Sequence, residues 1–482
     1  MIKSKHTRKA GNKLEVRVRM YRQGLGDCFL IRFKRGSHQS FMLIDCGVFV
    51  GTEDQTNRMR SVTQDIKCET GGQIDLLVAT HQHWDHLSGF LQAQDVWDDI
   101  EIARLWLAWT EKPDDGLARK LRGEQELGLQ AARLALDRFP KSVSAYRDGI
   151  AGVIDFFGQA DATDKKVSGT QAAIEYLRQR AGERICYLYP PLPDKVAEPI
   201  EGVFDGVRFY VLGPPYDEQK IKRSDPRKGE AYGFSRAALA EGLLATVRPT
   251  STSDDADSQT GYVPFDPYYR VSVSEAKGDP FFKQHYGFNK SHSQQPWRRI
   301  DDVWISMTGG LALTLDSDTN NTSLALAIEL VESGDVLLFP GDAQAGNWAS
   351  WDSCRWSVCD GNDAKCIINV EQLLNRVVFY KVGHHGSHNA TLQGRGLELM
   401  TNKEKMVAFI PVDREVVNER KWKMPFPPLE TALLDKTMGR LLLGHEDELP
   451  PDRLKGLSPR QRAKFNNACE ITELFVDYTL MD

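Results

Sequence analysis

The stretch His81-Gln82-His83-Trp84-Asp85-His86 follows directly on the apolar run from Ile74 to Thr80. That run is typical of a buried strand, and loops after strand ends are where α/β proteins place functional side chains. Residues two apart in an extended segment point the same way, so His81 and His83 can share one ion. Asp85 and His86 follow in the next turn and can reach a second ion. Imidazole and carboxylate ligands suit Zn²⁺ or Mn²⁺.

Two later strand ends carry the same kinds of side chain. The run from Asp335 to Phe339 ends at Pro340-Gly341-Asp342, and the run from Val377 to Val382 ends at Gly383-His384-His385-Gly386. A carboxylate at Asp342 can bridge two ions. Six of the 11 histidines fall within the two His-rich stretches His81 to His86 and His384 to His388. We therefore interpret the motifs as one metal site rather than as separate structural or solvated side chains.

These motifs resemble those of a known superfamily. His81-x-His83-x-Asp85-His86 looks like the signature of the metallo-β-lactamase superfamily, and Gly341-Asp342 is similar to its bridging-aspartate motif. Gly383-His384-His385-Gly386 resembles its late histidine motif, in which the ligand precedes the glycine, so the role passes to His385. The stretches Gln23 to Cys28 and Leu43 to Gly47 look like its first hairpin. The resemblance implies two divalent ions, Zn²⁺ or Mn²⁺, with the ligands His81, His83, Asp85, His86, Asp342 and His385.

A narrower resemblance covers residues 15–95 and 303–412. The series Asn320 to Leu324, Leu338 to Ala343 and Lys381 to Ser387 is similar to the soluble metallo-β-lactamase domain of bacterial competence (DNA-uptake) proteins. Many superfamily members have one more histidine between the first motif and the bridging aspartate. Here that interval holds only His285 and His292, and Asn320 to Ser323 stand in the slot. We expect the ion of His81 and His83 to be the less firmly held of the two.

The resemblance implies an αββα sandwich of two mixed sheets flanked by helices. We divide the chain into an N-terminal half of this domain (1–94), a partly helical insertion (95–300), a C-terminal half (301–412) and a C-terminal extension (413–482). Helical patterns predict helices over Gly116 to Phe139, Thr170 to Ala181 and Pro428 to Leu434. We also predict that Leu311 to Leu315 and Ser323 to Leu330 are paired strands, joined by a turn over Asp316 to Asn321, and that Ser251 to Gly261 form a mobile loop.

Composition excludes some classes of protein. The chain has 482 residues, a net charge of −6, 41% hydrophobic and 27% charged residues. This balance is typical of a globular protein with a buried core and not of a generally basic protein that coats nucleic acid. No apolar run reaches the roughly 20 residues that cross a bilayer, and no apolar segment follows the basic N-terminus. Eight scattered cysteines do not form a disulfide framework. We therefore expect a cytoplasmic protein without membrane contact.

The superfamily resemblance implies hydrolysis by a metal-activated hydroxide. Asp85 would be a metal ligand that also orients the attacking water. His384, Ser387 and His388 stand beside the predicted site and could contact a phosphate or protonate a leaving group, so His384 and His388 join Asp85 as catalytic candidates. The alternative for His384, Ser387 and His388 is that they support the ligands or stabilise the loop.

Nucleic acid is the first substrate that we predict, because the competence-type branch is associated with nuclease activity. Two basic stretches would suit a phosphate backbone, namely Lys220, Lys222, Arg223, Arg227 and Lys228, and Trp297-Arg298-Arg299. The alternative for both is a solvated charged loop. Other readings are a hydrolase of small phosphoesters, cyclic nucleotides, lactones or thioesters, and a scaffold without catalysis. The insertion or the C-terminal extension could bind a protein partner, for example in bacterial defence.

Overall fold

The computed structural model describes residues 13–139, 144–158, 168–223, 271, 273–286, 303–359 and 365–481. The chain divides into two compact units. The first unit consists of Met1–Arg119, Asp155–Lys228 and Ser317–Asp482, and the second of Lys120–Ile154 and Gly229–Asp316. The residues of the predicted metal site all belong to the first unit.

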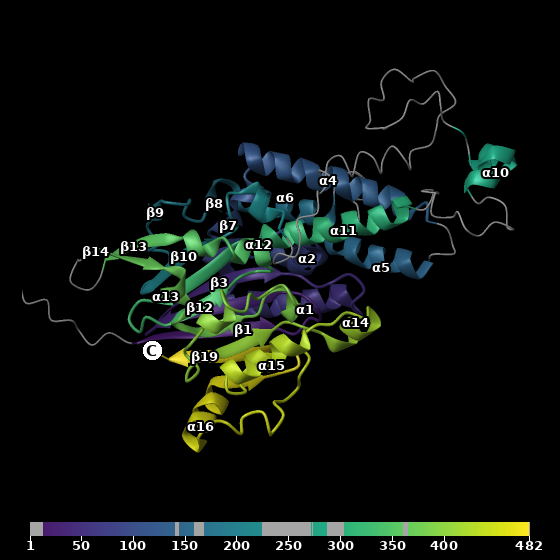
Figure 1. The fold of residues 1–482 in the computed structure, drawn as a ribbon. Coiled ribbons are helices and arrows are strands. Elements are labelled where there is room, and N and C mark those ends of the chain that lie inside the picture. The colour runs from purple at the N-terminus through teal and green to yellow at the C-terminus, as the bar shows by residue number, and fades with distance from the viewer. Residues whose placement is uncertain are drawn as a thin grey trace, which may run out of the picture. The chain divides into compact units, whose positions relative to one another are not determined.

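The first unit contains an eight-stranded sheet (Figure 1). Its order is β18 (Cys469–Ile471), β19 (Phe475–Met481), β1 (Leu14–Tyr21), β2 (Cys28–Arg35), β3 (His38–Cys46), β5 (Leu76–Ala79), β7 (Leu105–Ala108) and β8 (Ile185–Leu188). The strands from β18 to β3 pair antiparallel, and those from β3 to β8 pair parallel. The sheet is therefore mixed, and β3, β5, β7 and β8 end at the same edge.

A second sheet of six strands belongs to the same unit. Its order is β10 (Val207–Gly213), β11 (Ala325–Leu330), β12 (Val336–Phe339), β15 (Val377–Lys381), β16 (Val407–Ile410) and β17 (Leu441–Leu443). The pairs from β12 to β17 are parallel, so these four strands also end at one edge.

Buried side chains between the two sheets form a central core. In β5, Leu76 and Val78 face this core, whereas Leu77 and Ala79 face the helices outside the first sheet. This alternation explains why the whole strand is apolar, because both of its faces are covered. Across the core the rings of Phe29 and Phe339 lie 5.8 Å apart, edge to face. The two sheets are thus the inner layers of the sandwich.

Helices cover the outer face of each sheet. On the first sheet these are α1 (Gln55–Thr70), α2 (Trp84–Gln92), α3 (Gln94–Trp97) and α6 (Gly169–Ala181). On the second they are α12 (Ala345–Trp348), α13 (Val370–Leu374), α14 (Arg414–Glu419) and α15 (Pro427–Lys436). The unit also contains α7 (Glu218–Ile221), α16 (Pro459–Ala468), a sheet of β14 (Lys365–Asn369), β13 (Arg355–Cys359) and β9 (Val196–Ala197), and the pair β4 (Gln73–Ile74) and β6 (Glu101–Ile102).

The second unit is helical in the residues described. It holds α5 (Ser144–Ile154), α9 (Val273–Gly278), α10 (Pro280–Tyr286) and most of α4 (Gly116–Leu136) and α11 (Val303–Asn321). Helices α4 and α11 pack closely at Gly128, where a Cβ atom would lie 2.8 Å from Leu315 Cδ2. The glycine allows this approach.

The αββα class and the three predicted helices are confirmed. The pairing of Leu311–Leu315 with Ser323–Leu330 is wrong, because Leu311 to Leu315 lie inside α11 and the predicted turn is the last turn of that helix. Strand β11 pairs instead with β10 and β12. The four-part division of the chain stays a prediction; strands from 95–223 and from 413–481 are members of the two sheets. The predicted loop from Ser251 to Gly261 lies outside the described residues.

Candidate metal centre

The three motifs lie together although they come from different sheets. The first follows β5 and runs into the first turn of α2, whereas Asp342 follows β12 and His385 follows β15. His385 Nε2 lies 2.8 Å from Asp85 Oδ2, so the two sheets meet at this point. The strand ends that carried the motifs in the sequence therefore form one site.

Four of the six predicted ligands form a compact cluster. One ligand atom from each of Asp85, His86, Asp342 and His385 lies within 4.8 Å of the others, and all four residues are buried. His86 Nε2 lies 3.2 Å from Asp342 Oδ2 and 3.8 Å from Asp85 Oδ2. Imidazole nitrogens and carboxylate oxygens that converge on one point are a donor set for a divalent ion.

His81 and His83 form the neighbouring part of the site. His81 Nε2 lies 3.1 Å from His83 Nδ1. Two nitrogen ligands of one tetrahedral zinc ion, each about 2.0–2.1 Å from the metal, stand about 3.3 Å apart. The pair therefore fits a shared ion. The ring of His81 lies 4.2 Å from that of His86, and the rings of Phe156 and Phe157 pack against His83 at 5.5 and 5.2 Å.

Several polar atoms of the cluster are buried without a hydrogen bond. Among the described residues these include Asp85 Oδ1, Asp342 Oδ2 and His86 Nε2. Buried carboxylate oxygens that lack a donor are costly, and a cation would satisfy them. The residues present therefore fit a divalent metal ion.

The charges of the site favour the protonation states that bind metal at the carboxylates. Burial alone would raise the pKa of Asp85, but His86 and His385 outweigh it and lower that pKa. The pKa of Asp342 is likewise lowered, because Lys381 and His86 outweigh its burial. Burial lowers the pKa of His83 to about 3, so this ring is neutral at pH 7.

The two histidines of the cluster behave differently from His83. Burial would lower their pKa values, but the surrounding carboxylates, Asp342 for His86 and Asp85 for His385, raise them. Metal binding therefore has to displace protons from His86 and His385.

Asp45 contacts the ring nitrogen of His86 that points away from the cluster. Its Oδ2 accepts a hydrogen bond from His86 Nδ1 at 2.7 Å, and its two oxygens also accept from Thr80 N and Oγ1, each at 2.7 Å. With Nδ1 donating to Asp45, Nε2 is the nitrogen of His86 that faces the cluster and that would give up its proton to bind metal. His385 is oriented in the same manner, because its Nδ1 lies 2.7 Å from the carbonyl oxygen of Pro411. Asp45 was not predicted as a site residue, although it stands in the quoted stretch Leu43 to Gly47.

Asp342 is fixed through one of its two oxygens. Oδ1 accepts from Lys381 Nζ at 3.0 Å and from the backbone N of His384 at 2.9 Å, while Oδ2 faces His86. The preceding Gly341 has φ of 59°, and a Cβ there would lie 2.9 Å from the Cβ of Ser323. A glycine is thus required where the chain turns into the site.

Asn321 and Ser323 lie in the segment that takes the place of the additional histidine, and they hold the neighbouring loop through hydrogen bonds. Asn321 Nδ2 donates to the carbonyl oxygens of Ile221 and Arg223, and its Oδ1 accepts from the backbone N of Gln344 and Asn347. These four bonds use both donors and both acceptor positions of the side-chain amide, so Asn321 fixes the loop that contains Gln344 and Asn347. Ser323 Oγ accepts from the backbone N of Asp342 at 3.0 Å. Of the two histidines in the interval, His285 lies on α10 and His292 is outside the described residues.

The catalytic candidates after β15 separate into two groups. His384 is buried, with Nδ1 2.8 Å from Ser387 Oγ and 3.3 Å from Gln344 Nε2, and burial lowers its pKa to about 4. His388 is exposed, and its ring lies 6.1 Å from that of Phe426. The structure thus brings His384 and Ser387, but not His388, into the buried region beside Asp342.

Two lysines of the predicted basic stretch are paired with acids. Lys222 Nζ lies 2.6 Å from Glu218, and Lys220 Nζ lies 4.0 Å from Asp217. The carbonyl oxygen of Arg223 accepts from Asn321. Arg227, Lys228 and Trp297 to Arg299 lie outside the described residues.

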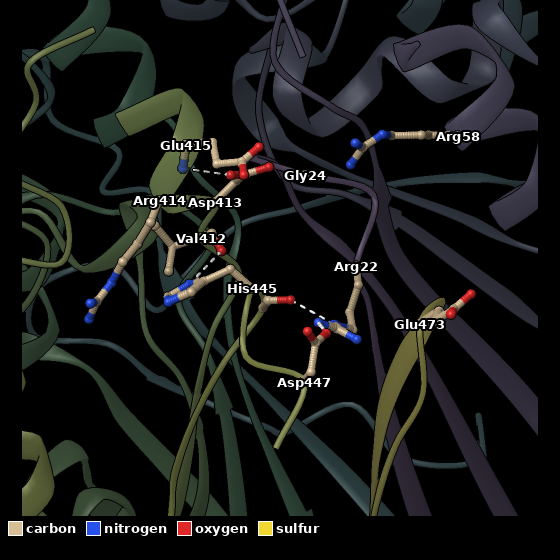
Figure 2. Close-up of a pocket in the computed structure, with 11 residues that line it drawn as sticks. Arg22, Gly24, Arg58, Val412, Asp413, Arg414, Glu415, His445, Asp447 and Glu473 are labelled. Carbon is tan, nitrogen blue, oxygen red and sulfur yellow. Dashed lines mark hydrogen bonds and ion pairs between the residues drawn. The ribbon is translucent and has the colours of Figure 1, made fainter. Parts of the chain in front are cut away.

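A pocket of about 530 Å³ lies at neighbouring strand ends. It is lined by residues after β1, β16 and β17, by Arg58 of α1 and by Glu473, which precedes β19. Val412 in its wall follows the Pro411 that holds His385 (Figure 2). Three arginines and His445 face four carboxylates there. Figure 2 shows Arg22 turned toward Asp447, 2.6 Å away. Because its charges are mixed, the pocket does not by itself favour an anionic ligand.

Part of the chain matches a known protein family. Residues 21–156 match the model of the metallo-beta-lactamase superfamily, a span that includes the first motif, Asp27 and Asp45. No curated protein matches the chain. Within the described ranges, no helix combines the length and the apolar character needed to cross a membrane. The matched domain and the buried His/Asp cluster support the use of divalent metal and indicate a metal-dependent hydrolase. Over residues 21–156 the chain therefore shows the metallo-β-lactamase superfamily domain.

Proposed function

We propose that the protein is a metal-dependent phosphodiesterase that cleaves DNA or RNA with two divalent ions, Zn²⁺ or Mn²⁺. The observation that carries the proposal is the buried cluster of Asp85, His86, Asp342 and His385, with oxygen atoms that lack donors inside a metallohydrolase domain. The narrower resemblance to competence proteins, at Asn320 to Leu324 and Lys381 to Ser387, supports a nucleic-acid substrate.

The ligands divide into two sets that share one residue. His81 Nε2 and His83 Nδ1 would hold one ion, and Asp85, His86 Nε2 and His385 Nε2 would hold the other. Asp342 would contribute Oδ2, because its Oδ1 is engaged by Lys381 and His384. Divalent ions held in this way lower the pKa of a bound water from about 15.7 toward about 7 and stabilise charge on phosphate oxygens.

The protein's own groups orient the reactants. Asp85 accepts a hydrogen bond from an attacking water through Oδ1, the oxygen that has no other donor among the described residues. His384 is neutral at pH 7, since its pKa is about 4, and with Ser387 it donates a hydrogen bond to a phosphate or leaving oxygen. Cytoplasmic location and a protein partner bound through residues 95–300 or 413–482 stay predictions.

The depth of the cluster favours a second candidate function. Asp85, Asp342 and His83 are each 1% exposed, and His86 and His385 are fully buried. A small phosphoester reaches such a site more easily than a duplex does. A small-molecule phosphoesterase is therefore the second reading.

A degradation assay tests the proposal. The purified chain is incubated with Mn²⁺ or Zn²⁺ and with plasmid DNA, single-stranded RNA or bis-p-nitrophenyl phosphate. We expect nucleic acid to be cleaved, and His83→Ala and Asp342→Ala to lower the rate more than about a hundredfold, since each removes a ligand. The matched control is His38→Ala, an exposed histidine on β3 that should leave the rate unchanged.

The outcomes separate the candidate functions. Equal degradation by the wild type and both ligand variants would reject the nuclease. Activity on the small phosphodiester alone would support the second reading. Failure to bind metal and to hydrolyse any substrate would support the third reading, a non-catalytic scaffold with the same fold.

A further inference from the structure

Lys381 is a buried cation inside the proposed metal centre. It is the last residue of β15, and its side chain is 1% exposed. Its ammonium group forms an ion pair with Asp27, lies 3.0 Å from Asp342 Oδ1 and donates to the carbonyl oxygen of Gly341 at 3.0 Å. Three acceptors match the three protons of an ammonium group, so Lys381 has no donor left for a substrate.

Asp27 stands behind the ligands rather than among them. It is 2% exposed, and its Oδ2 lies 3.8 Å from His86 Nδ1, the ring nitrogen that faces away from the cluster. Its Oδ1 accepts no hydrogen bond from the described residues. Asp27 is fixed through its backbone, since its N donates to the carbonyl oxygen of Asp85 at 2.9 Å. Its side chain therefore acts on the centre mainly through charge and through Lys381.

The charges of the centre are not fully balanced without metal, because Lys381 and the protonated rings of His86 and His385 face four carboxylates. Four carboxylates, those of Asp27, Asp45, Asp85 and Asp342, are each no more than 2% exposed. Lys381 is the lysine that contacts two of them. Buried like charges repel strongly, because the interior screens them less than water does. A fixed cation among the carboxylates keeps them together before metal binds, and it repels the ions that bind later.

We propose that Lys381 is a positioning residue that presets the charge of the metal centre. It holds Asp342 Oδ1, so that Oδ2 alone faces the ions, and it stabilises the metal-free site at the expense of metal affinity. Asp27 offsets part of the lysine charge. The inference rests on the proposed metal centre, and it adds a residue pair that tunes how tightly the centre holds its ions.

Two single variants should move metal affinity in opposite directions. Lys381→Met removes a positive charge next to the ligands, so we expect the dissociation constant for Mn²⁺ or Zn²⁺ to fall by about tenfold or more. Asp27→Asn leaves the lysine less compensated, so the dissociation constant should rise by about tenfold. If the two side chains acted only by holding the ligands in place, both variants would bind metal more weakly. Shifts of the dissociation constant in opposite directions would therefore indicate an effect of charge.

The experiment measures metal affinity rather than turnover. Metal-free full-length protein is titrated with Mn²⁺ or Zn²⁺ in competition with a chelating dye, and thermal unfolding is recorded with and without the ion. Lys381→Met should unfold at a lower temperature when metal-free and gain more from the ion than the wild type does. Lys405→Met is the matched control, because this lysine pairs with Asp335 on the surface and is 57% exposed.

A double variant keeps the test decisive if Lys381→Met does not fold. Asp27→Asn combined with Lys381→Met removes the pair together, and we expect a metal affinity close to that of the wild type. Weaker binding in both single variants, or in the double variant, would overturn the inference while leaving the metal centre intact. Absence of metal binding in the wild type would instead reject the proposed function.

Discussion

His86 uses its two ring nitrogens for different tasks. Nε2 faces Asp342 and Asp85, whereas Nδ1 lies 2.7 Å from Asp45. Asp45 adopts a left-handed backbone conformation with φ of 56°, which brings its carboxylate under both Thr80 and His86. A carboxylate in this place fixes the tautomer of the ring and makes it a better ligand.

Asp45→Asn tests this support. Asparagine tolerates the left-handed conformation, so the backbone should persist while the charge is lost. We expect the affinity for Mn²⁺ or Zn²⁺ to fall about 10–100-fold, as measured by titration of the metal-free protein. Asp75→Asn is the control, because Asp75 accepts a hydrogen bond from the backbone N of Phe41 in the same sheet and lies outside the ligand cluster. An unchanged affinity in Asp45→Asn would contradict the supporting role.

The positions of the proposed ligands could be predicted from the sequence, whereas those of the residues that contact them could not. His81 to His86, Asp342 and His385 stand in dense motifs of metal-binding side chains at strand ends. Asp27, Asp45 and Lys381 stand alone among apolar residues, and only strand pairing brings them to the ligands. A single carboxylate or lysine is a common surface residue, so no local pattern distinguishes a buried one.

The error in the segment before β11 has a physical cause. Leu311 to Leu315 form a short apolar run, which fits a buried strand as well as a turn of a buried helix. Leu311 and Leu315 are both buried, one helical turn apart, and the helix continues to Asn321. The long periodic helices α4 and α6 left no such ambiguity. Sequence alone therefore predicted the sheets and covering helices of the sandwich better than it predicted α11, the helix that ends at Asn321.

The antiparallel pair β1 and β19 is held by a buried ion pair. Arg19 Nε and Nη2 each lie 2.8 Å from an oxygen of Asp477, and Arg19 Nη1 reaches Asp65 of α1 at 2.7 Å. Both partners are almost completely buried, and the guanidinium carbon of Arg19 lies 3.4 Å from the ring centre of Phe475. This network ties a helix and two strands together.

Asp477→Asn should therefore destabilise the protein strongly. Removal of one partner from a buried pair typically costs about 3–5 kcal/mol. Asp65, which is partly exposed, would compensate only part of the Arg19 charge that remains. Chemical denaturation should show this loss in the free energy of unfolding. Asp447→Asn is the matched control, because Asp447 pairs with Arg22 but is 88% exposed and should cost less than about 1 kcal/mol. Similar losses of unfolding free energy in the two variants would contradict the expectation that the buried pair contributes more to stability than the exposed pair.

Metal should stabilise the whole protein, and more so in alkaline solution. An ion present at about 100 times its dissociation constant adds about 2.7 kcal/mol to the free energy of unfolding. The metal-free pKa values of His86 and His385 are raised, so these rings hold protons that the ion must displace, and affinity falls as the pH falls. Thermal unfolding with and without Mn²⁺ should show a larger rise at about pH 8 than at about pH 6.

Chelator and a ligand variant provide the controls for this measurement. EDTA should return the unfolding temperature of the wild type to its metal-free value. Asp342→Ala should show little rise with Mn²⁺ at either pH, because it removes a proposed ligand of both ions. A rise that did not depend on pH would speak against His86 and His385 as ligands.

The pairing of β19 with β1 also has a consequence for biosynthesis. Arg19 and Asp477 are direct partners across these strands, yet 458 residues separate them in the chain. A ribosome that adds about 5–20 residues per second needs roughly half a minute to a minute and a half between the two. During that interval one edge of β1 has no neighbouring strand in the nascent chain, so a chaperone that shields this edge would protect the polypeptide until its last strands emerge.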